Sequence, residues 1–266
     1  MFAKLFRYFA FICRRERTAS LIWIVSLVGL ALGFAALFPR LVPDQASLDQ
    51  MGAAMANPAM VAMMGKVYGL ENLTQASIMA QECLIWFVTA AAIMNILLVN
   101  RHTRADEEGG RLEMIRALPV GRLTGSLAVV KFAFLLNLVI SLFTGALLLP
   151  IGGVTAAGAF TYGFAIGAVG LLFAALTLLA AQLFSTAQAV SGFGFGALLV
   201  FYLLRASGDV SGSILSSISP LGLGLKVEAF YANRVLPLVV LVGESIALTG
   251  IALAVNLVRD HGSGLI

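Results

Sequence analysis

The stretch that decides the fold is RHTRADEEGGRLEMIRALPVGR, at residues 101–122. It contains five arginines and four acidic residues, in a chain that is 60% hydrophobic and only 11% charged. Long apolar runs precede and follow it. Because charges at this density cannot lie in lipid, the stretch must face water or a protein partner between two membrane spans.

The composition defines the class of protein. The chain has 266 residues and a mean hydropathy of +0.98, too apolar for a soluble domain of this length. Lipid offers no hydrogen-bond partners, and the continuous apolar runs of about 20 residues fit helices better than barrel strands. The sequence therefore predicts an all-α polytopic membrane protein. The net charge of +4 is a topology signal and gives no case for nucleic-acid binding.

The apolar runs predict one transmembrane domain with six spans, at residues 20–38, 78–99, 123–149, 160–184, 189–204 and 238–258. The aromatic and basic residues of segment 1–18 suit an interfacial helix against anionic lipid, although they could simply flank the first span. Residues 205–237 are too polar to span and too apolar for an ordinary loop. We expect a re-entrant or surface helix there, on the outer face. We also expect a short outer-surface helix in residues 39–74, broken near Pro58.

The distribution of cations predicts the orientation. With the N-terminus inside, eleven Lys and Arg fall on inner segments and five on outer ones, with Lys131 inside the membrane. The outer five include Arg205, which this count assigns to a loop. The positive-inside rule therefore places residues 101–122 and the N-terminus in the cytoplasm. We expect a multi-pass protein of a bacterial plasma membrane, in contact with membrane lipid.

Within the charged stretch, the spacing predicts a bent helical element. Arg104 and Glu108 lie four residues apart, as helical ion pairs do. The pair Gly109–Gly110 favours a bend, and Pro119 ends a second short helix that presents an apolar ridge. This shape suits a groove on a partner. The alternative is a solvated loop that only anchors the topology.

The charged stretch resembles the RHTRxDEExGRxExxRxLPVGR pattern of permease subunits of ABC-2 type exporters, especially the polyketide-antibiotic or multidrug exporters. The resemblance extends to MGKVYGLENLT at residues 64–74 and RDHGSGL at residues 259–265. It implies that residues 101–122 form a coupling helix against a separate ATPase subunit with two nucleotide-binding domains. The contact residues that it implies are Arg104, Asp106, Glu107, Glu108, Arg111, Glu113 and Arg116.

The length of the chain departs from many members of that family, which have about twice as many residues and two six-span halves. The chain resembles the N-terminal half. Either it is a fragment of a twelve-span permease, or it pairs with a second six-span unit, as a homodimer or a heterodimer. The resemblance leaves the substrate open among amphipathic drugs, antibiotics, peptides and lipids.

The sequence shows no motif for ATP hydrolysis or for another catalytic activity. It has no Walker A motif, HExxH or GxSxG, and His102 and His261 flank spans, where we expect them to be solvated. We therefore expect no catalytic site, no metal site and no cofactor in this chain, with ATP and magnesium bound by the partner.

Three intramembrane charges, Glu82, Lys131 and Glu244, are candidates for a substrate pathway or gate, or for structural pairs. They also support an alternative function. The chain could be a proton-coupled carrier, or another six-span membrane protein, that needs no ATPase.

Overall fold

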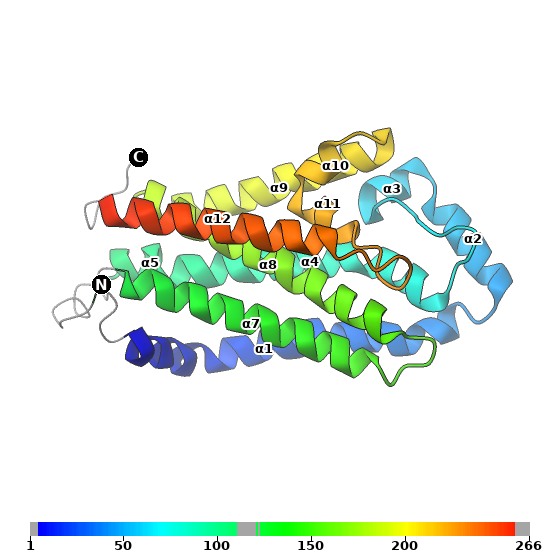
Figure 1. Cartoon of the computed structure of the whole chain (residues 1–266), viewed down its shortest axis with the longest axis horizontal. Helices are drawn as coiled ribbons and strands as arrows, with labels where there is room; N and C mark the ends of the chain where they lie inside the picture. Colours follow the sequence, from blue (N-terminus) through cyan, green and yellow to red (C-terminus); the bar gives the residue numbers. More distant parts are fainter. Residues whose placement is uncertain (1–4, 111–120, 122, 259–266) are drawn as a thin grey trace.

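The computed structural model describes residues 5–110, 121 and 123–258, and every regular element in this part of the chain is an α-helix. Six stretches are long and apolar enough to cross a membrane, which confirms the predicted fold class. Figure 1 shows them side by side along one axis. They are α1 (Leu5–Leu41), α4 with α5 (Gln75–Glu108), α7 (Thr124–Leu148), α8 (Ala156–Leu183), α9 (Ala187–Ser211) and α12 (Leu236–Val258).

Helix α8 is the centre of the bundle. In its most apolar window 78% of the residues are buried, against 17% in α9 and α12. A β-carbon on Gly163 would lie 2.3 Å from the Ser141 carbonyl oxygen of α7, and one on Gly167 would lie 2.8 Å from the Asn137 carbonyl oxygen. Only glycine allows the two helices to pack this closely.

The core of the bundle holds one reciprocal amide pair. Asn95 of α4 donates to the side-chain oxygen of Asn137 on α7 at 3.1 Å, and Asn137 donates back at 2.8 Å. Each amide also donates to the carbonyl four residues earlier in its own helix. Both side chains are buried, so their hydrogen-bonding groups are satisfied away from water.

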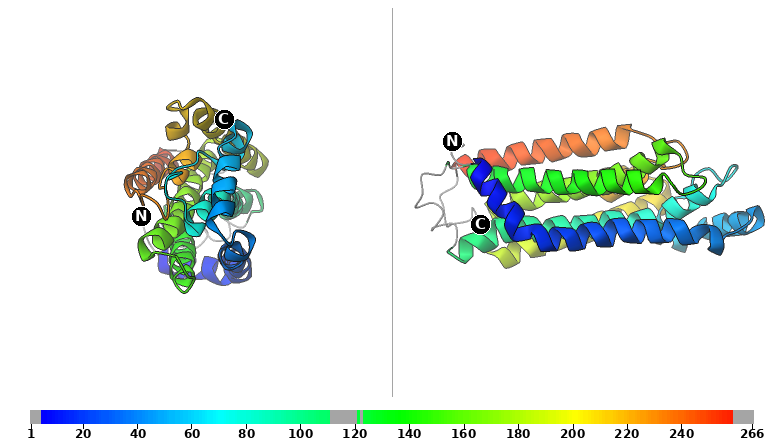
Figure 2. Two further views of the ribbon diagram at one scale, coloured as in Figure 1. Left: turned by 90° about the vertical axis from the view of Figure 1, so that its right-hand side faces the viewer. Right: turned by 90° about the horizontal axis from the view of Figure 1, so that it is seen from below.

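The N-terminal segment and the first span form one helix. The sequence suggested an interfacial helix at residues 1–18 and a separate span at 20–38, but α1 runs unbroken through both from Leu5. Residues 14–21 contain no glycine or proline that would end the helix. Figure 2 (right) shows that the N-terminal part of α1 is inclined to the rest, so the two segments differ in direction without a break.

The two ends of the bundle differ (Figure 1). Helix α5 and the turn between α8 and α9 lie at one end. The other end carries α2 (Gln45–Met55), α3 (Pro58–Met64), α10 (Leu215–Ile218) and α11 (Pro220–Leu225). Helices α2 and α3 are separated at Asn57–Pro58, where the Asn57 side chain caps α3. The buried α11 packs against α4, α8 and α12, so the segment before the last span folds back into the bundle.

The fifth span is longer than the sequence suggested. We expected it to end at residue 204, with Arg205 in a loop, but α9 continues to Ser211 and Arg205 is fully buried in it. The Arg205 guanidinium donates to the carbonyls of Val61 and Met63 at 3.3 and 3.2 Å, and lies 3.7 Å from Asp209. These partners offset the buried positive charge, so Arg205 connects α3 to α9 and does not count as a loop charge.

Candidate functional site

The candidate site is the joint at the end of α4, defined here as residues 101–108. Helix α4 ends at His102, and Thr103 interrupts the helical geometry with φ −118° and ψ −92°. The Thr103 hydroxyl donates to the carbonyl of Val99 at 2.6 Å, which stabilises the end of α4. Helix α5 (Arg104–Glu108) then continues as a single short turn. Within the described residues the helix bends at Thr103, ahead of the bend expected at Gly109–Gly110. The second short helix expected before Pro119 lies outside the described residues.

The joint is bound to α1 by charged side chains around two buried carboxylates, Asp106 and Glu16. The Arg15 guanidinium binds Asp106 in a two-pronged pair, with distances of 2.6 and 3.1 Å. The Nε2 atom of His102 lies 3.0 Å from the Glu16 carboxylate, and Arg101 lies 3.3 Å from the same carboxylate. His102 is only 2% exposed, so our expectation that it is solvated was wrong. The carboxylates of Glu16 and Asp106 lie 3.0 and 3.7 Å from this buried imidazole.

The joint is also fastened to the turn that leads into α9. The Nε atom of Arg104 donates to the Ser185 carbonyl at 2.8 Å, while its guanidinium pairs with Glu107 at 2.5 Å. The sequence suggested a pair between Arg104 and Glu108, but Glu108 instead accepts a hydrogen bond from the backbone N–H of Ala187, at 2.7 Å. A carboxylate at this position also complements the dipole at the N-terminus of α9.

The predicted partner-contact residues fall into two groups, those that the structure describes and those that it does not. Arg104, Asp106, Glu107 and Glu108 bind groups within the chain, and Arg104 and Asp106 are buried. Arg111, Glu113 and Arg116 lie outside the described residues. Sequence reasoning missed Arg15, Glu16 and Ser185 as members of the joint. The one signal for the first two was the single acid in the basic run RRER at residues 14–17.

The structure does not bring the three intramembrane charges together. Lys131 of α7 lies over the rings of Phe6 and Phe9 in α1, with its nitrogen 4.5 and 4.9 Å from their centroids. Glu244 is exposed on α12. Glu82 of α4 lines a groove between α4 and α1. The described residues include no ion pair that joins any two of the three charges.

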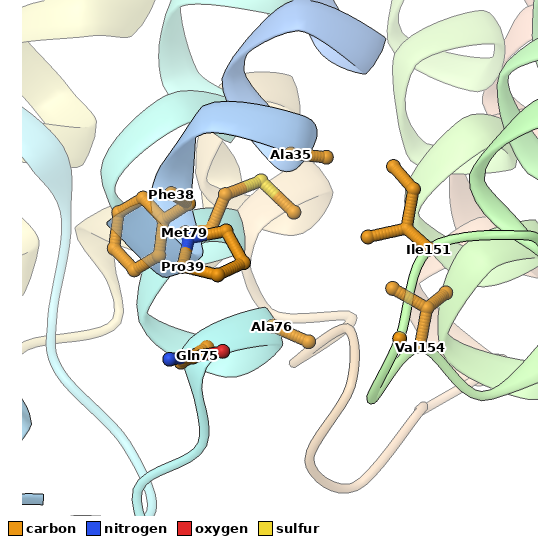
Figure 3. Close-up of a pocket in the computed structure, with 9 residues that line it drawn as sticks. Ala35, Phe38, Pro39, Gln75, Ala76, Met79, Ile151 and Val154 are labelled. Carbon is orange, nitrogen blue, oxygen red and sulfur yellow. The ribbon is translucent and has the colours of Figure 1, made fainter. Parts of the chain in front are cut away.

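Two hollows on α1 differ greatly in size. At the end opposite the joint, Ile151 and Val154 face Ala35 and Met79 across a narrow gap (Figure 3). Its volume of about 10 Å³ has room for about one water molecule. The groove beside Glu82 has a volume of about 390 Å³, enough for a small organic molecule.

Six apolar helices and a charged joint at one end define a polytopic membrane protein, in which the joint connects three of the spans. A family model described as the C-terminal domain of the multidrug efflux system permease Rv1217c matches residues 5–255. The chain belongs to this family. The charged stretch had led us to compare the chain with the N-terminal half of such permeases, whereas the matching model describes a C-terminal domain.

One similar curated protein is the multidrug efflux system permease protein Rv1217c of Mycobacterium tuberculosis (strain ATCC 25618 / H37Rv). It is 37% identical over 261 residues, which cover 95% of this chain and 46% of that protein. The chain thus spans about half the length of this relative.

Proposed function

We propose that the chain is a membrane part of an ATP-driven exporter of the ABC-2 type, which moves an amphipathic substrate out of a bacterial cell. The observation that carries the proposal is the joint. Through Asp106, Arg104 and Glu108, the short helix α5 is bound to α1 and to the start of α9, while it continues directly from α4. A force applied beyond α5 would therefore reach three spans at once.

We propose that a separate ATPase subunit supplies the energy for transport, since the sequence carries no nucleotide-binding motif of its own. We place residues 101–122 and the N-terminus in the cytoplasm, where this ATPase would bind. A second six-span half, from the same or another polypeptide, would complete the transporter. The name of the mycobacterial relative, a multidrug efflux permease of about twice the length, supports both the exporter role and the second half.

We propose two roles for the residues of the charged motif. Asp106, Glu107 and Glu108 have partners inside the chain and would transmit movement. Arg111, Glu113 and Arg116 follow them in the sequence, and we propose that these three contact the ATPase. Charge reversal in the first group should disturb the fold of the joint, whereas reversal in the second group should disturb only the complex.

The rival function, a proton-coupled carrier, depends on Glu82, Lys131 and Glu244 acting together. Their separation in the described structure gives this rival no common proton path. The exporter is therefore the function that the geometry supports better.

The experiment is co-purification of the chain with a candidate ABC ATPase subunit from the same genome, followed by measurement of vanadate-sensitive ATP hydrolysis. Arg116→Glu should abolish co-purification and leave the thermal stability of the chain unchanged. Arg15→Met should keep the complex but lower the stability of the chain and uncouple transport from hydrolysis. Transport that continues on a proton gradient without any ATPase would refute the proposal.

A further inference from the structure

The groove between α1 and α4 is apolar apart from one acidic side chain. Its floor is formed by buried side chains that include Leu27, Cys83 and Phe87. Its rims are Phe34 of α1 and Trp86 of α4, which are 47% and 50% exposed. The two aromatic side chains therefore stand at the mouth of a groove that opens sideways from the bundle.

Glu82 is the charged residue in this lining. It is partly buried, and its carboxylate forms no hydrogen bond or ion pair with the residues that the structure describes. It lies seven residues after the start of α4, which is about 10 Å along the helix axis. A carboxylate at this depth in apolar surroundings is unfavourable unless it is protonated or meets a cation.

We propose that this groove binds hydrophobic organic cations and that Glu82 selects them by charge. The inference rests on the exporter function proposed above and names the substrate class. The volume of about 390 Å³ falls within the range of about 300–1,000 Å³ that is usual for drug-sized ligands. A carboxylate in the same lining as Trp86 and Phe34 suits a quaternary or protonated amine, since carboxylates and aromatic rings both attract a cation.

Charge complementarity favours an organic cation over a lipid tail as the occupant. An acyl chain would cover the apolar floor but would leave the Glu82 carboxylate unpaired. A hydrophobic cation would cover the same floor and neutralise the carboxylate. The groove lies within the single chain, between α1, α4 and Met64 of α3, so the binding does not require a residue from a second half.

The test uses the purified full chain in detergent micelles with two ligands of similar size and shape, the cation tetraphenylphosphonium and the neutral triphenylphosphine oxide. The chain has two tryptophans, Trp23 and Trp86, so Trp23→Phe leaves a single reporter at the groove. We expect tetraphenylphosphonium to quench Trp86 saturably. Quenching by brominated phosphatidylcholine that tetraphenylphosphonium does not relieve would assign the groove to lipid and overturn the proposal.

The decisive variant is Glu82→Gln, which removes the charge and keeps the shape. We expect it to weaken tetraphenylphosphonium binding about tenfold or more, and to change binding of the neutral ligand less than about threefold. Asp49→Asn, which removes an exposed carboxylate from α2 outside the groove, is the matched control and should change neither. Equal effects of Glu82→Gln on both ligands, or no effect on either, would overturn the proposal.

A second measurement covers the case in which Glu82→Gln does not fold. In the unsubstituted chain, a hydrophobic carbodiimide should label Glu82, and tetraphenylphosphonium should protect it while triphenylphosphine oxide should not. Labelling that is indifferent to the cation would refute the inference.

The outcomes also separate this inference from the proposed exporter function. If the purified chain binds the cation but neither co-purifies with an ATPase nor couples to ATP hydrolysis, the groove assignment stands and the exporter function fails. If the chain couples to an ATPase but does not bind the cation, the exporter function stands and the groove assignment fails.

Discussion

Replacing Arg15 with methionine is the sharpest test of the joint. The substitution keeps an unbranched side chain on α1 and removes the cation that binds Asp106 at 2.6 Å. The Asp106 side chain is 4% exposed and the Arg15 side chain 20% exposed, so the carboxylate would remain buried without its main partner. His102 lies farther from Asp106, at 3.7 Å.

The cost follows from that burial. Breaking a fully buried ion pair by removing one partner costs about 3–5 kcal/mol. Because Arg15 is partly exposed, we expect a smaller loss than that, about 2–3 kcal/mol in the free energy of unfolding. Arg14→Met removes the same charge from an exposed neighbouring position and should cost less than about 0.5 kcal/mol.

The assay is reversible unfolding of the purified chain in mixed micelles, compared among Arg15→Met, Asp106→Leu and the double variant. Since the double variant leaves no buried charge unpaired, it should be more stable than the sum of the single losses predicts, by at least about 1 kcal/mol. Single losses that simply add, or an Arg15→Met chain as stable as Arg14→Met, would show that the pair does not hold the joint.

Two further predictions concern other parts of the chain. Gly163→Leu should abolish the folded yield in size-exclusion chromatography, because even a β-carbon would lie 2.3 Å from the carbonyl oxygen of Ser141, whereas Gly196→Leu, at a site with open space, should keep the yield. The exposed Tyr231 hydroxyl donates to the Glu71 carboxylate at 2.7 Å and lowers the pKa of that carboxyl below its ordinary value near 4.5. This contact should therefore stabilise the loop that contains Glu71 fully above pH 4.5, and the stabilisation should be lost as the pH falls through the lowered pKa. Proteolysis of this loop should rise at low pH in the natural chain and should depend less on pH in Glu71→Gln.

Sequence reasoning reached the fold class and the place of the joint for one physical reason. Lipid excludes charge and unpaired backbone groups, so apolar runs of sufficient length must be helices, and a charge-rich stretch between them must leave the membrane. The same reasoning misjudged Arg205. A cation normally ends a span, but here Asp209 and the carbonyls of α3 satisfy it inside the bundle. Asp209 is only four residues from Arg205, but the two carbonyls belong to residues more than a hundred positions away in the sequence.

In the candidate site, too, the sequence predicted which residues matter but not which groups they contact. The sequence identified Asp106, Glu107 and Glu108 as important and could not show what they bind. The spacing favoured a pair between Arg104 and Glu108 on one helix face, yet the α8–α9 turn offers Glu108 a backbone N–H and leaves Arg104 to Glu107. An isolated helix would have no such competitor.

The sequence by itself determined that this protein is a six-span helical membrane protein with one charge-dense joint, because these properties follow from local composition and the chemistry of lipid. Only the tertiary structure decided which charges meet. It placed Arg15 on Asp106 and His102 beside Glu16, and it put Glu82 in an apolar groove without an ion-pair partner among the described residues. Ion pairs act over a few ångströms, so their partners are set by how the helices pack and not by their distance along the chain.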